Sequence, residues 1–219
     1  LAATFDTEAL EKVGAIVSTE ARARYNTLSK LGDRDIYKGL TLWSPNINIF
    51  RDPRWGRGHE TYGEDPYLTA ELAVAFINGL QGDDPDYLKT AACAKHFACY
   101  SGPEDLRHEF DAVVSEKDLR ETYFPAFKAS VERAQVESVM SAYNRLNGEA
   151  CSASPYLLQK ILRDEWGFEG HVVSDCWAIK DIFTDHGLAD NPVDGVALAI
   201  DAGCDLNCGS CYGHAVDAV

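Results

Sequence analysis

Apolar residues along the chain follow two different spacings, and the two alternate from one end to the other. Short apolar runs bounded by turn residues predict buried strands. They lie within residues 40–50, 91–98, 136–143, 171–174 and 204–206. Between these runs, apolar residues recur at helical spacing, as Leu10, Val13 and Val17 do near the start. The helices predicted in this way span residues 7–28, 65–80, 115–134, 155–166, 177–183 and 193–202.

Polar residues mark the starts of several predicted helices. Asp65 before Pro66 is typical of a helix N-terminus. The carboxylate can accept from the free backbone N–H groups of the first turn, and the N–H that proline lacks would have no partner there. Ser115 is a second cap candidate, and Thr7 with Glu11 nearby is a third. No internal repeat or flexible linker divides the 219 residues, so one continuous domain is expected. Strands alternating with helices predict a parallel sheet with crossover helices.

Polar residues at the ends of the predicted strands favour a barrel over an open sheet. They are Lys95–His96, Tyr143–Asn144, Ser174–Asp175 and Asp205. In a (β/α) barrel, functional groups from several successive strands meet at the carboxyl ends. A doubly wound oxidoreductase sheet usually has a Gly-rich first turn, and the sequence contains neither GxGxxG nor GxxxxGK[ST]. Because about five strands are predicted where a barrel has eight, the expected fold class is α/β, an incomplete (β/α)8 TIM-barrel-like fold.

The charge of the chain narrows its expected partners. Asp and Glu number 35 against 20 Lys and Arg, giving a formal net charge of −15. An acidic surface repels phosphate backbones and anionic lipids, so neither nucleic acid nor a membrane is expected as a partner, and a neutral ligand is favoured. Simple solubility explains the charge equally well. No apolar run approaches the roughly 18 residues that a membrane-spanning helix needs.

Seven cysteines leave at least one unpaired within the chain. Cys93, Cys99 and Cys176 lie in or beside apolar runs and are interpreted as small buried hydrophobic residues. A second cluster consists of Cys204, Cys208, Cys211 and His214. Its spacing matches no common zinc site, so core positions or a local disulfide are favoured over metal binding.

Asp175 is the candidate nucleophile. It follows the predicted strand 171–174 and is separated by one residue from Trp177. An ionised carboxylate beside an aromatic ring suits a sugar site, since the ring stacks on the sugar and the carboxylate attacks the anomeric carbon. In retaining glycosidases such a carboxylate forms a glycosyl-enzyme, and a second carboxyl acts as acid and then as base. The pattern equally fits a carboxylate that only caps the next helix.

Three further residues at the ends of predicted strands offer hydrogen-bond donors. Lys95 and His96 lie together at the end of one predicted strand and can donate to adjacent sugar hydroxyls. Tyr143, at the end of another, can donate to the nucleophile or the sugar, and a half-buried core tyrosine is the alternative.

Arg57 lies in the loop RDPRWGRG, residues 51–58, and can add a forked contact to a sugar. Ion pairs between the arginines of this loop and nearby acidic residues are the stronger interpretation from the residues alone. The acidic candidates are Asp52, Glu60 and Glu64.

Five sequence motifs resemble the family-3 glycoside hydrolases, most closely the bacterial β-xylosidase and β-glucosidase members. The motifs are SPNINIFRDPRWGRGHETYGEDP at 44–66, AKHF at 94–97, MSAYNRLNG at 140–148, ILRDEWGFEGHVVSDCWAI at 161–179 and AGCDLNCG at 202–209. They follow the family's order and spacing across nearly the whole chain. The resemblance is specific because several long, separate motifs must coincide.

The resemblance implies roles for individual residues. Asp175 matches the family's nucleophile, and Lys95 with His96 match the basic pair that binds hydroxyls of the non-reducing-end sugar. Arg57 matches another contact in that subsite, and Tyr143 matches the tyrosine near the nucleophile.

Two departures from the family's patterns bear on the site. In many relatives an aromatic residue follows the nucleophile. Here Cys176 stands between Asp175 and Trp177, which weakens the match of Trp177 to that stacking residue. The N-acetylglucosaminidase branch carries an Asp-x-His pair after its Lys-His motif, and this chain lacks that pair. The lack argues against amino-sugar specificity.

The resemblance also implies what residues 1–219 represent. They are expected to form part of the N-terminal (β/α) barrel domain, without its early segment and without the C-terminal domain that carries the acid/base glutamate. The implied activity is retaining, exo-acting hydrolysis of β-linked xylo- or gluco-oligosaccharides at non-reducing ends, with no metal or organic cofactor. The alternative is a catalytically inert remnant that binds sugar.

Overall fold

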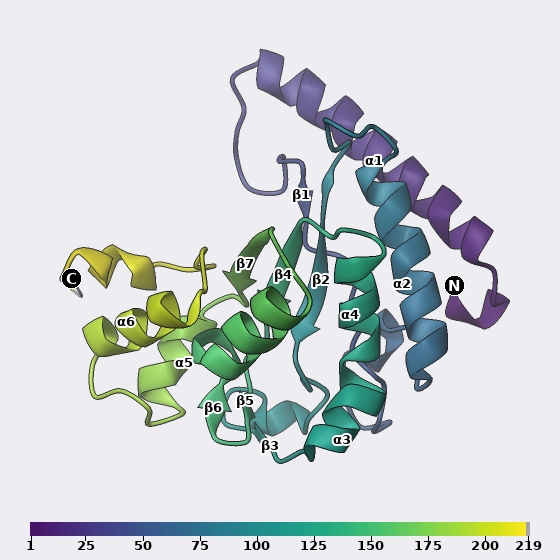
Figure 1. Ribbon diagram of the computed structural model, residues 1–219. Coiled ribbons are helices and arrows are strands. Elements are labelled where there is room, and N and C mark those ends of the chain that lie inside the picture. The colour runs from purple at the N-terminus through teal and green to yellow at the C-terminus, as the bar shows by residue number, and fades with distance from the viewer. Residues whose placement is uncertain (218–219) are drawn as a thin grey trace.

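Four parallel strands form the central sheet in the computed structural model, which describes residues 1–217 (Figure 1). The strands are β1 (Thr41–Leu42), β2 (Ala91–Phe97), β4 (Ser138–Ser141) and β7 (His171–Ser174), and they lie in the order β1-β2-β4-β7. Each neighbouring pair is parallel. The parallel sheet predicted from the alternation is therefore confirmed.

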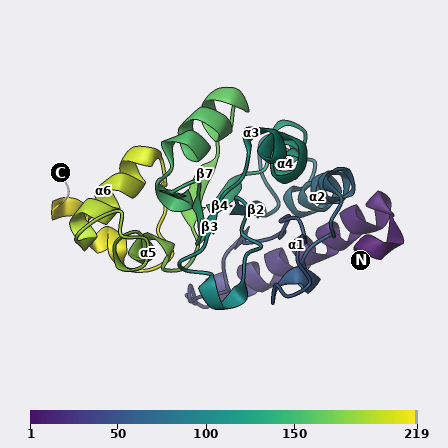
Figure 2. The ribbon, with the colours of Figure 1, turned by 90° about the horizontal axis from the view of Figure 1, so that it is seen from below.

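Helices surround these strands in an arc, as the view from below shows (Figure 2). Their bounds are α1 (Thr7–Lys30), α2 (Pro66–Gln81), α3 (Glu116–Asp118), α4 (Pro125–Glu132), α5 (Ala178–Thr184) and α6 (Pro192–Ala202), with the π-helical segments η4 (Leu119–Tyr123) and η6 (Tyr156–Glu165). The 3-10 segments are η1 (Ala2–Thr4), η2 (Gly58–Glu60), η3 (Glu104–Leu106), η5 (Cys151–Ala153) and η7 (Cys211–Asp217). Within the described residues, none of the helices has both the length and the apolar character needed to cross a bilayer.

Side-chain caps fix the starts of the two longest helices. Asp65 accepts from the backbone N–H of Leu68 at 2.6 Å, as predicted. The cap of α1 is Asp6 rather than Thr7, because the Asp6 carboxylate accepts from the N–H of Ala9 at 3.0 Å.

Two glycines allow α1 and α2 to pack closely. A Cβ at Gly79 would lie 2.1 Å from the carbonyl oxygen of Glu11, and one at Gly14 would lie 2.5 Å from the carbonyl oxygen of Phe76. Both distances are far below van der Waals contact, and the obstructing atoms are backbone that cannot rotate away. The approach of the two helices therefore depends on the missing side chains.

Gly79→Ala is expected to destabilise the chain by about 1–3 kcal/mol, the usual cost of an overpacked contact. Gly39→Ala is the matched control, because a Cβ at the exposed Gly39 would meet nothing within 4 Å. Urea unfolding followed by circular dichroism measures both. Equal stabilities of the two variants would contradict the close packing of α1 on α2.

Several predicted elements are shorter or more interrupted than the sequence pattern indicates. The helix predicted over 115–134 is divided into α3, η4 and α4, because Pro125 has no N–H to donate and forces a wider turn, in which the N–H of Phe124 reaches the carbonyl of Leu119. The strand candidates at 40–50 and 204–206 contribute only β1 and the single bridges Asn46–Lys95 and Val173–Leu206.

A second, small sheet was not predicted. It consists of β3 (Asp111–Ala112), β5 (Arg145–Leu146) and β6 (Glu149–Ala150) and lies below the central sheet in Figure 1. The turn between β5 and β6 is Asn147-Gly148, and both residues have positive φ, 49° and 90°. Asn-Gly is a strong signal for a tight hairpin turn, so this hairpin was predictable from the sequence.

The cysteine predictions are partly wrong. Cys93 and Cys99 are buried, as expected, and so are Cys204 and Cys211. Cys176, however, is not a packed hydrophobic residue, because it forms a disulfide with Cys208 across 32 residues of sequence. The prediction failed because nothing in the local pattern indicates such a distant partner.

Candidate active site

Asp175 lies directly after β7, almost fully buried at 7% exposure. Its N–H donates to the carbonyl of Ser141 on the neighbouring strand at 3.1 Å, which fixes the backbone. Oδ1 accepts from the N–H of Cys176 at 2.8 Å, and Oδ2 has no hydrogen-bond partner within the described part of the chain. Because α5 has no side-chain cap, the interpretation of Asp175 as a helix cap is wrong. One carboxylate oxygen is therefore held and the other is free.

The charge of Asp175 is set by two opposing effects. Burial raises the pKa of Asp175, and the positive charges of Arg57, Lys95 and Arg107 act against that rise. Three cations around one buried carboxylate favour its ionised form, which is the form that a nucleophile requires.

His96 is buried beside Asp175 at a bulge in β2. The register against β4 shifts between Lys95 and Phe97, so His96 is the extra residue. Its Nδ1 lies 2.9 Å from Asn48 Oδ1, an oxygen that can only accept, and its Nε2 lies 3.1 Å from Arg57 Nη1, a nitrogen that can only donate. His96 is therefore the neutral tautomer with the proton on Nδ1, and burial holds its pKa well below the usual value.

The 3.5 Å contact between His96 Nε2 and Asp175 Oδ2 is consequently not an ion pair. A neutral imidazole whose Nε2 lone pair accepts from Arg57 has no proton to offer the carboxylate. The contact therefore leaves the charge of the Asp175 carboxylate unneutralised.

Arg57 is mostly committed to other protein groups. Its Nε and Nη2 donate to the two oxygens of Glu60 at 2.8 and 2.7 Å, so the ion-pair interpretation of this arginine is confirmed. With Nη1 on His96, three of the five N–H groups of a guanidinium are in use. Two N–H groups remain for a ligand, so the two interpretations of Arg57 are compatible.

Lys95 is half-buried at the end of β2, beside His96. No hydrogen bond or ion pair of its ammonium occurs within the described residues. Burial lowers the pKa of Lys95, and the carboxylates of Asp175 and Glu60 act in the opposite direction. A partly desolvated ammonium without a partner is suited to bind the hydroxyls of an incoming ligand.

Aromatic rings lie near Asp175. Tyr143 is buried, its pKa is raised first by burial and then by the charge of Asp175, and its ring centroid lies 6.0 Å from that of Tyr100. Tyr100 in turn packs on His96 with a centroid distance of 4.5 Å. Tyr143 is thus a buried tyrosine near Asp175, so its assignment to the site stays a prediction.

Trp177 is half-exposed, at 51%, in a left-handed backbone conformation with φ 69°. Its N–H donates to the carbonyl of Cys208 at 2.7 Å, and the adjacent disulfide fastens the same two segments. The indole borders an open pocket of about 690 Å³. The pocket is lined by Asp105, His108, Glu109, Trp177, Lys180, Asp181 and Asp185. The exposed ring can stack on a ligand.

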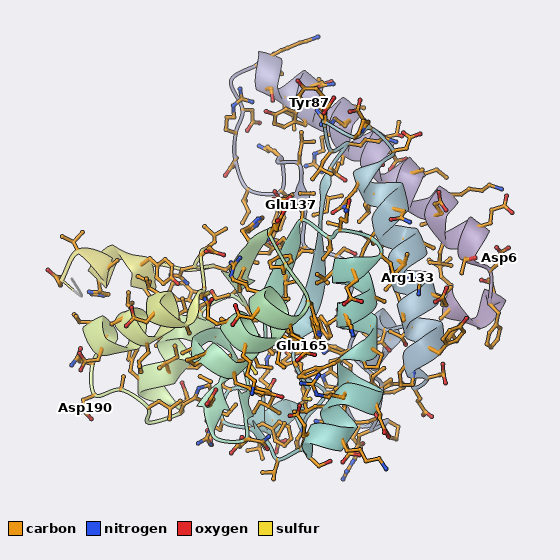
Figure 3. All side chains as sticks on the ribbon, in the orientation of Figure 1. Asp6, Tyr87, Arg133, Glu137, Glu165 and Asp190 are labelled. Carbon is orange, nitrogen blue, oxygen red and sulfur yellow. A yellow bond between two sulfur atoms is a disulfide. The ribbon has the colours of Figure 1, made fainter. Side chains whose placement is uncertain are left out.

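Asp205 lies away from Asp175 and the residues around it. Its Oδ2 accepts from the N–H of Val172 at 2.7 Å and from Arg163 at 2.8 Å. These contacts place it at the amino end of β7, near Glu137. Figure 3 labels Glu137 above the central strands, on the side away from the small sheet of Figure 1. The expectation that Asp205 lies with the other polar residues at the carboxyl ends of the strands is wrong, because its carboxylate is bound to Arg163 and to the N–H of Val172.

The sequence interpretation missed three residues that shape the site. Asn48 fixes His96 through the ring and through both backbone groups, with its Oδ1 accepting from the His96 N–H and its Nδ2 donating to the His96 carbonyl, each at 2.8 Å. Arg107 lies 5.0 Å from the Tyr143 ring centroid, and Tyr100 joins the aromatic rings described above. All three lie in loops, where no periodicity indicates a function.

Known proteins match this chain closely. A profile of the glycosyl hydrolase family 3 N-terminal domain matches residues 1–213. The chain is 51% identical over 218 residues to a xylan 1,4-beta-xylosidase of Xylanibacter ruminicola, and 46% identical over 225 residues to beta-D-xylosidase 3 of Arabidopsis thaliana. The alignments cover 98% and 100% of this chain but 25% and 28% of the relatives. The chain thus spans about a quarter of the length of these relatives.

Solved structures give the same result. A family 3 exo-beta-xylosidase in complex with a xylobiose aziridine activity-based probe superposes with a TM-score of 0.91 at 38% identity, covering 99% of this chain and 28% of that one. A beta-glucosidase from Listeria innocua superposes with a TM-score of 0.85 at 32% identity, with 99% and 28% covered. The predicted α/β class, an incomplete TIM-barrel-like fold, is confirmed. The chain belongs to glycosyl hydrolase family 3 and matches the N-terminal domain of that family.

Proposed function

We propose that this chain supplies the nucleophile and much of one sugar subsite of a retaining, exo-acting β-glycosidase. Its proposed substrates are β-linked xylo-oligosaccharides, cleaved at the O-glycosyl bond of the non-reducing end. The observation that carries the proposal is the buried carboxylate of Asp175, which has one oxygen held by Cys176 N–H and the other unpartnered among three cations. Such an oxygen is poised to attack carbon.

The proposed first step is a displacement at the anomeric carbon. Asp175 Oδ2 forms a bond to that carbon while the bond to the leaving-group oxygen breaks, and a general acid gives that oxygen a proton. Water then attacks the glycosyl ester, gives its proton to the same group acting as base, and releases the sugar with its original β configuration. In this proposal residues 1–219 form part of the N-terminal barrel domain, and the acid/base carboxyl belongs to another part of the enzyme.

Residues near Asp175 hold the sugar in this proposal. The Lys95 ammonium and the two remaining N–H groups of Arg57 donate to hydroxyls, and Trp177 stacks on the sugar ring. His96 stays neutral and, through its contact with Arg57, orients that guanidinium. Tyr143 lies near enough to Asp175 for the carboxylate's charge to raise its pKa, and in this proposal its hydroxyl donates to the nucleophile or the sugar.

Xylose is favoured over glucose by the relatives. Both curated proteins described above are named xylosidases, and the solved structure with the higher TM-score is an exo-beta-xylosidase. Glucose is the second candidate, because beta-glucosidases superpose well on the same residues.

A chimera tests this function. This chain replaces the matching segment of the Xylanibacter ruminicola xylosidase, and the product is tested on xylobiose and cellobiose with the anomer followed by proton NMR. The expected result is release of β-xylose first, with xylobiose cleaved faster than cellobiose. Release of the α anomer, or no cleavage of either sugar by a folded chimera, would contradict the proposal.

A further inference from the structure

A histidine–carboxylate pair lies beside the site and has no part in the proposed reaction. His108 Nδ1 lies 2.8 Å from Asp181 Oδ2. Asp181 is buried on α5, whereas the imidazole is half-exposed in the loop that follows η3. The two residues are 73 positions apart in sequence, so their contact fastens this loop to α5.

His108, the loop residue of the pair, contacts Tyr143 of the site. The ring of His108 packs edge-on against Tyr143, with a centroid distance of 4.7 Å and an interplanar angle of 64°. The preceding residue, Arg107, places its guanidinium over the same ring at 5.0 Å. Tyr143 is therefore held from one side by two consecutive residues of a single loop.

Asp181, the helix residue of the pair, lies on α5, which begins just after Asp175. Asp175 and Trp177 immediately precede α5, and the carbonyl of Asp175 accepts from the N–H of Ala178 at 3.1 Å. The disulfide from Cys176 to Cys208 further restrains this turn. Asp181 therefore belongs to the same short, restrained segment as the nucleophile.

We infer that His108 and Asp181 form a positioning pair that sets the loop of Arg107 against the nucleophile segment. Through this pair the Tyr143 hydroxyl and the Arg107 charge keep fixed places relative to Asp175, whose pKa Arg107 lowers. The inference rests on the proposed function. Neither residue of the pair is needed to touch the sugar.

The burial of Asp181 makes the pair difficult to rearrange. Burial and the nearby Asp185 raise the pKa of Asp181, and the hydrogen bond with His108 opposes that rise. Removing the imidazole leaves a buried carboxylate without this donor, which is costly. The chain is therefore restrained to keep the loop and the helix together.

The test measures how fast a dinitrophenyl 2-fluoro-β-xyloside labels the chain. Its good leaving group reduces the need for an acid, and intact-mass spectrometry gives both the maximal labelling rate and the half-saturating concentration. His108→Ala is expected to lower the maximal rate by roughly 10- to 100-fold, the effect of a small misplacement of reacting groups. The half-saturating concentration is expected to change much less, because the groups proposed to bind the sugar hydroxyls remain.

Three further variants separate positioning from general stability. His108→Asn retains an N–H that can donate to Asp181 and is expected to recover most of the rate. Asp181→Asn removes the charge but keeps an acceptor, so a smaller loss than that of His108→Ala is expected. The control His171→Asn alters a similar pair at the amino end of β7, where His171 lies 3.5 Å from Glu137, and should label at the parental rate.

The outcomes distinguish the inference from the proposed function. An unlabelled but folded parental chain overturns both. A labelled parental chain with His108→Ala and Asp181→Asn both at the parental rate overturns the positioning pair alone. A loss confined to the half-saturating concentration also overturns it, because that result makes His108 a sugar contact.

Discussion

Asp175→Ala in the chimera with the Xylanibacter ruminicola xylosidase is expected to lower turnover of xylobiose by roughly 10⁴-fold or more, as loss of a covalent nucleophile does in other enzymes. The physical reason is that Oδ2 of Asp175 is a buried carboxylate oxygen with no hydrogen-bond partner among residues 1–217. Steady-state kinetics measure the effect. Asp201→Ala, which removes an exposed carboxylate from α6, is the matched control and should retain parental turnover.

A chemical rescue makes this prediction sharper. Azide can occupy the space left by the carboxylate of Asp175→Ala and attack the anomeric carbon directly. A single displacement inverts the configuration, so the α-glycosyl azide is the expected product. Turnover of Asp175→Ala within tenfold of the parental chimera, or a β-configured azide product, would remove Asp175 from the nucleophile's role.

Lys95→Met is expected to have the second largest effect, a loss of about 10- to 100-fold in kcat/KM, typical of a lost hydrogen bond from a charged donor. Methionine keeps most of the side chain's volume and removes only the ammonium. Because the ammonium is half-buried and has no protein partner among the described residues, its loss should affect both KM and kcat. Lys128→Met on α4 is the control, since Lys128 is exposed and lies 3.7 Å from Glu132.

The pH profile gives an independent test of Lys95. The positive charge of Lys95 lowers the pKa of Asp175, so its removal should raise that pKa further. The nucleophile must be ionised, and activity falls as the pH drops through its pKa. The acidic limb of kcat/KM against pH is therefore expected to move to higher pH in Lys95→Met. An unmoved limb together with unchanged kinetics would contradict a role for Lys95 in the site.

The strands and most helices followed from local patterns. β7 occupies the predicted residues 171–174, and α2 begins at the predicted Asp65–Pro66 cap. These predictions succeeded because a buried parallel strand and a capped helix each leave a pattern in neighbouring residues. The small sheet had only two-residue strands, too short for any periodicity, and its Asn147-Gly148 turn was the one available signal.

The structure brings Asp175, Lys95, His96 and Arg57 together, but the contacts that connect them were not predictable. From the residues alone, Asp175 could be either a nucleophile or a helix cap, and the structure excludes the cap. Arg57 could likewise be either a ligand contact or an ion-pair partner. It forms an ion pair with Glu60, and that pair still leaves N–H groups for a ligand. The partner of Cys176 and the role of Asn48 were not predictable, because each depends on a contact between segments far apart in the chain.

The most direct test of the central claim is to locate the ester formed on this chain by the dinitrophenyl 2-fluoro-β-xyloside. The chain is first shown to be folded by circular dichroism, then labelled, digested and sequenced by mass spectrometry. The expected result is a single adduct on Asp175, formed faster than with the corresponding glucoside. An adduct on any other residue, or no adduct on the folded chain, would contradict Asp175 as the nucleophile that this chain supplies.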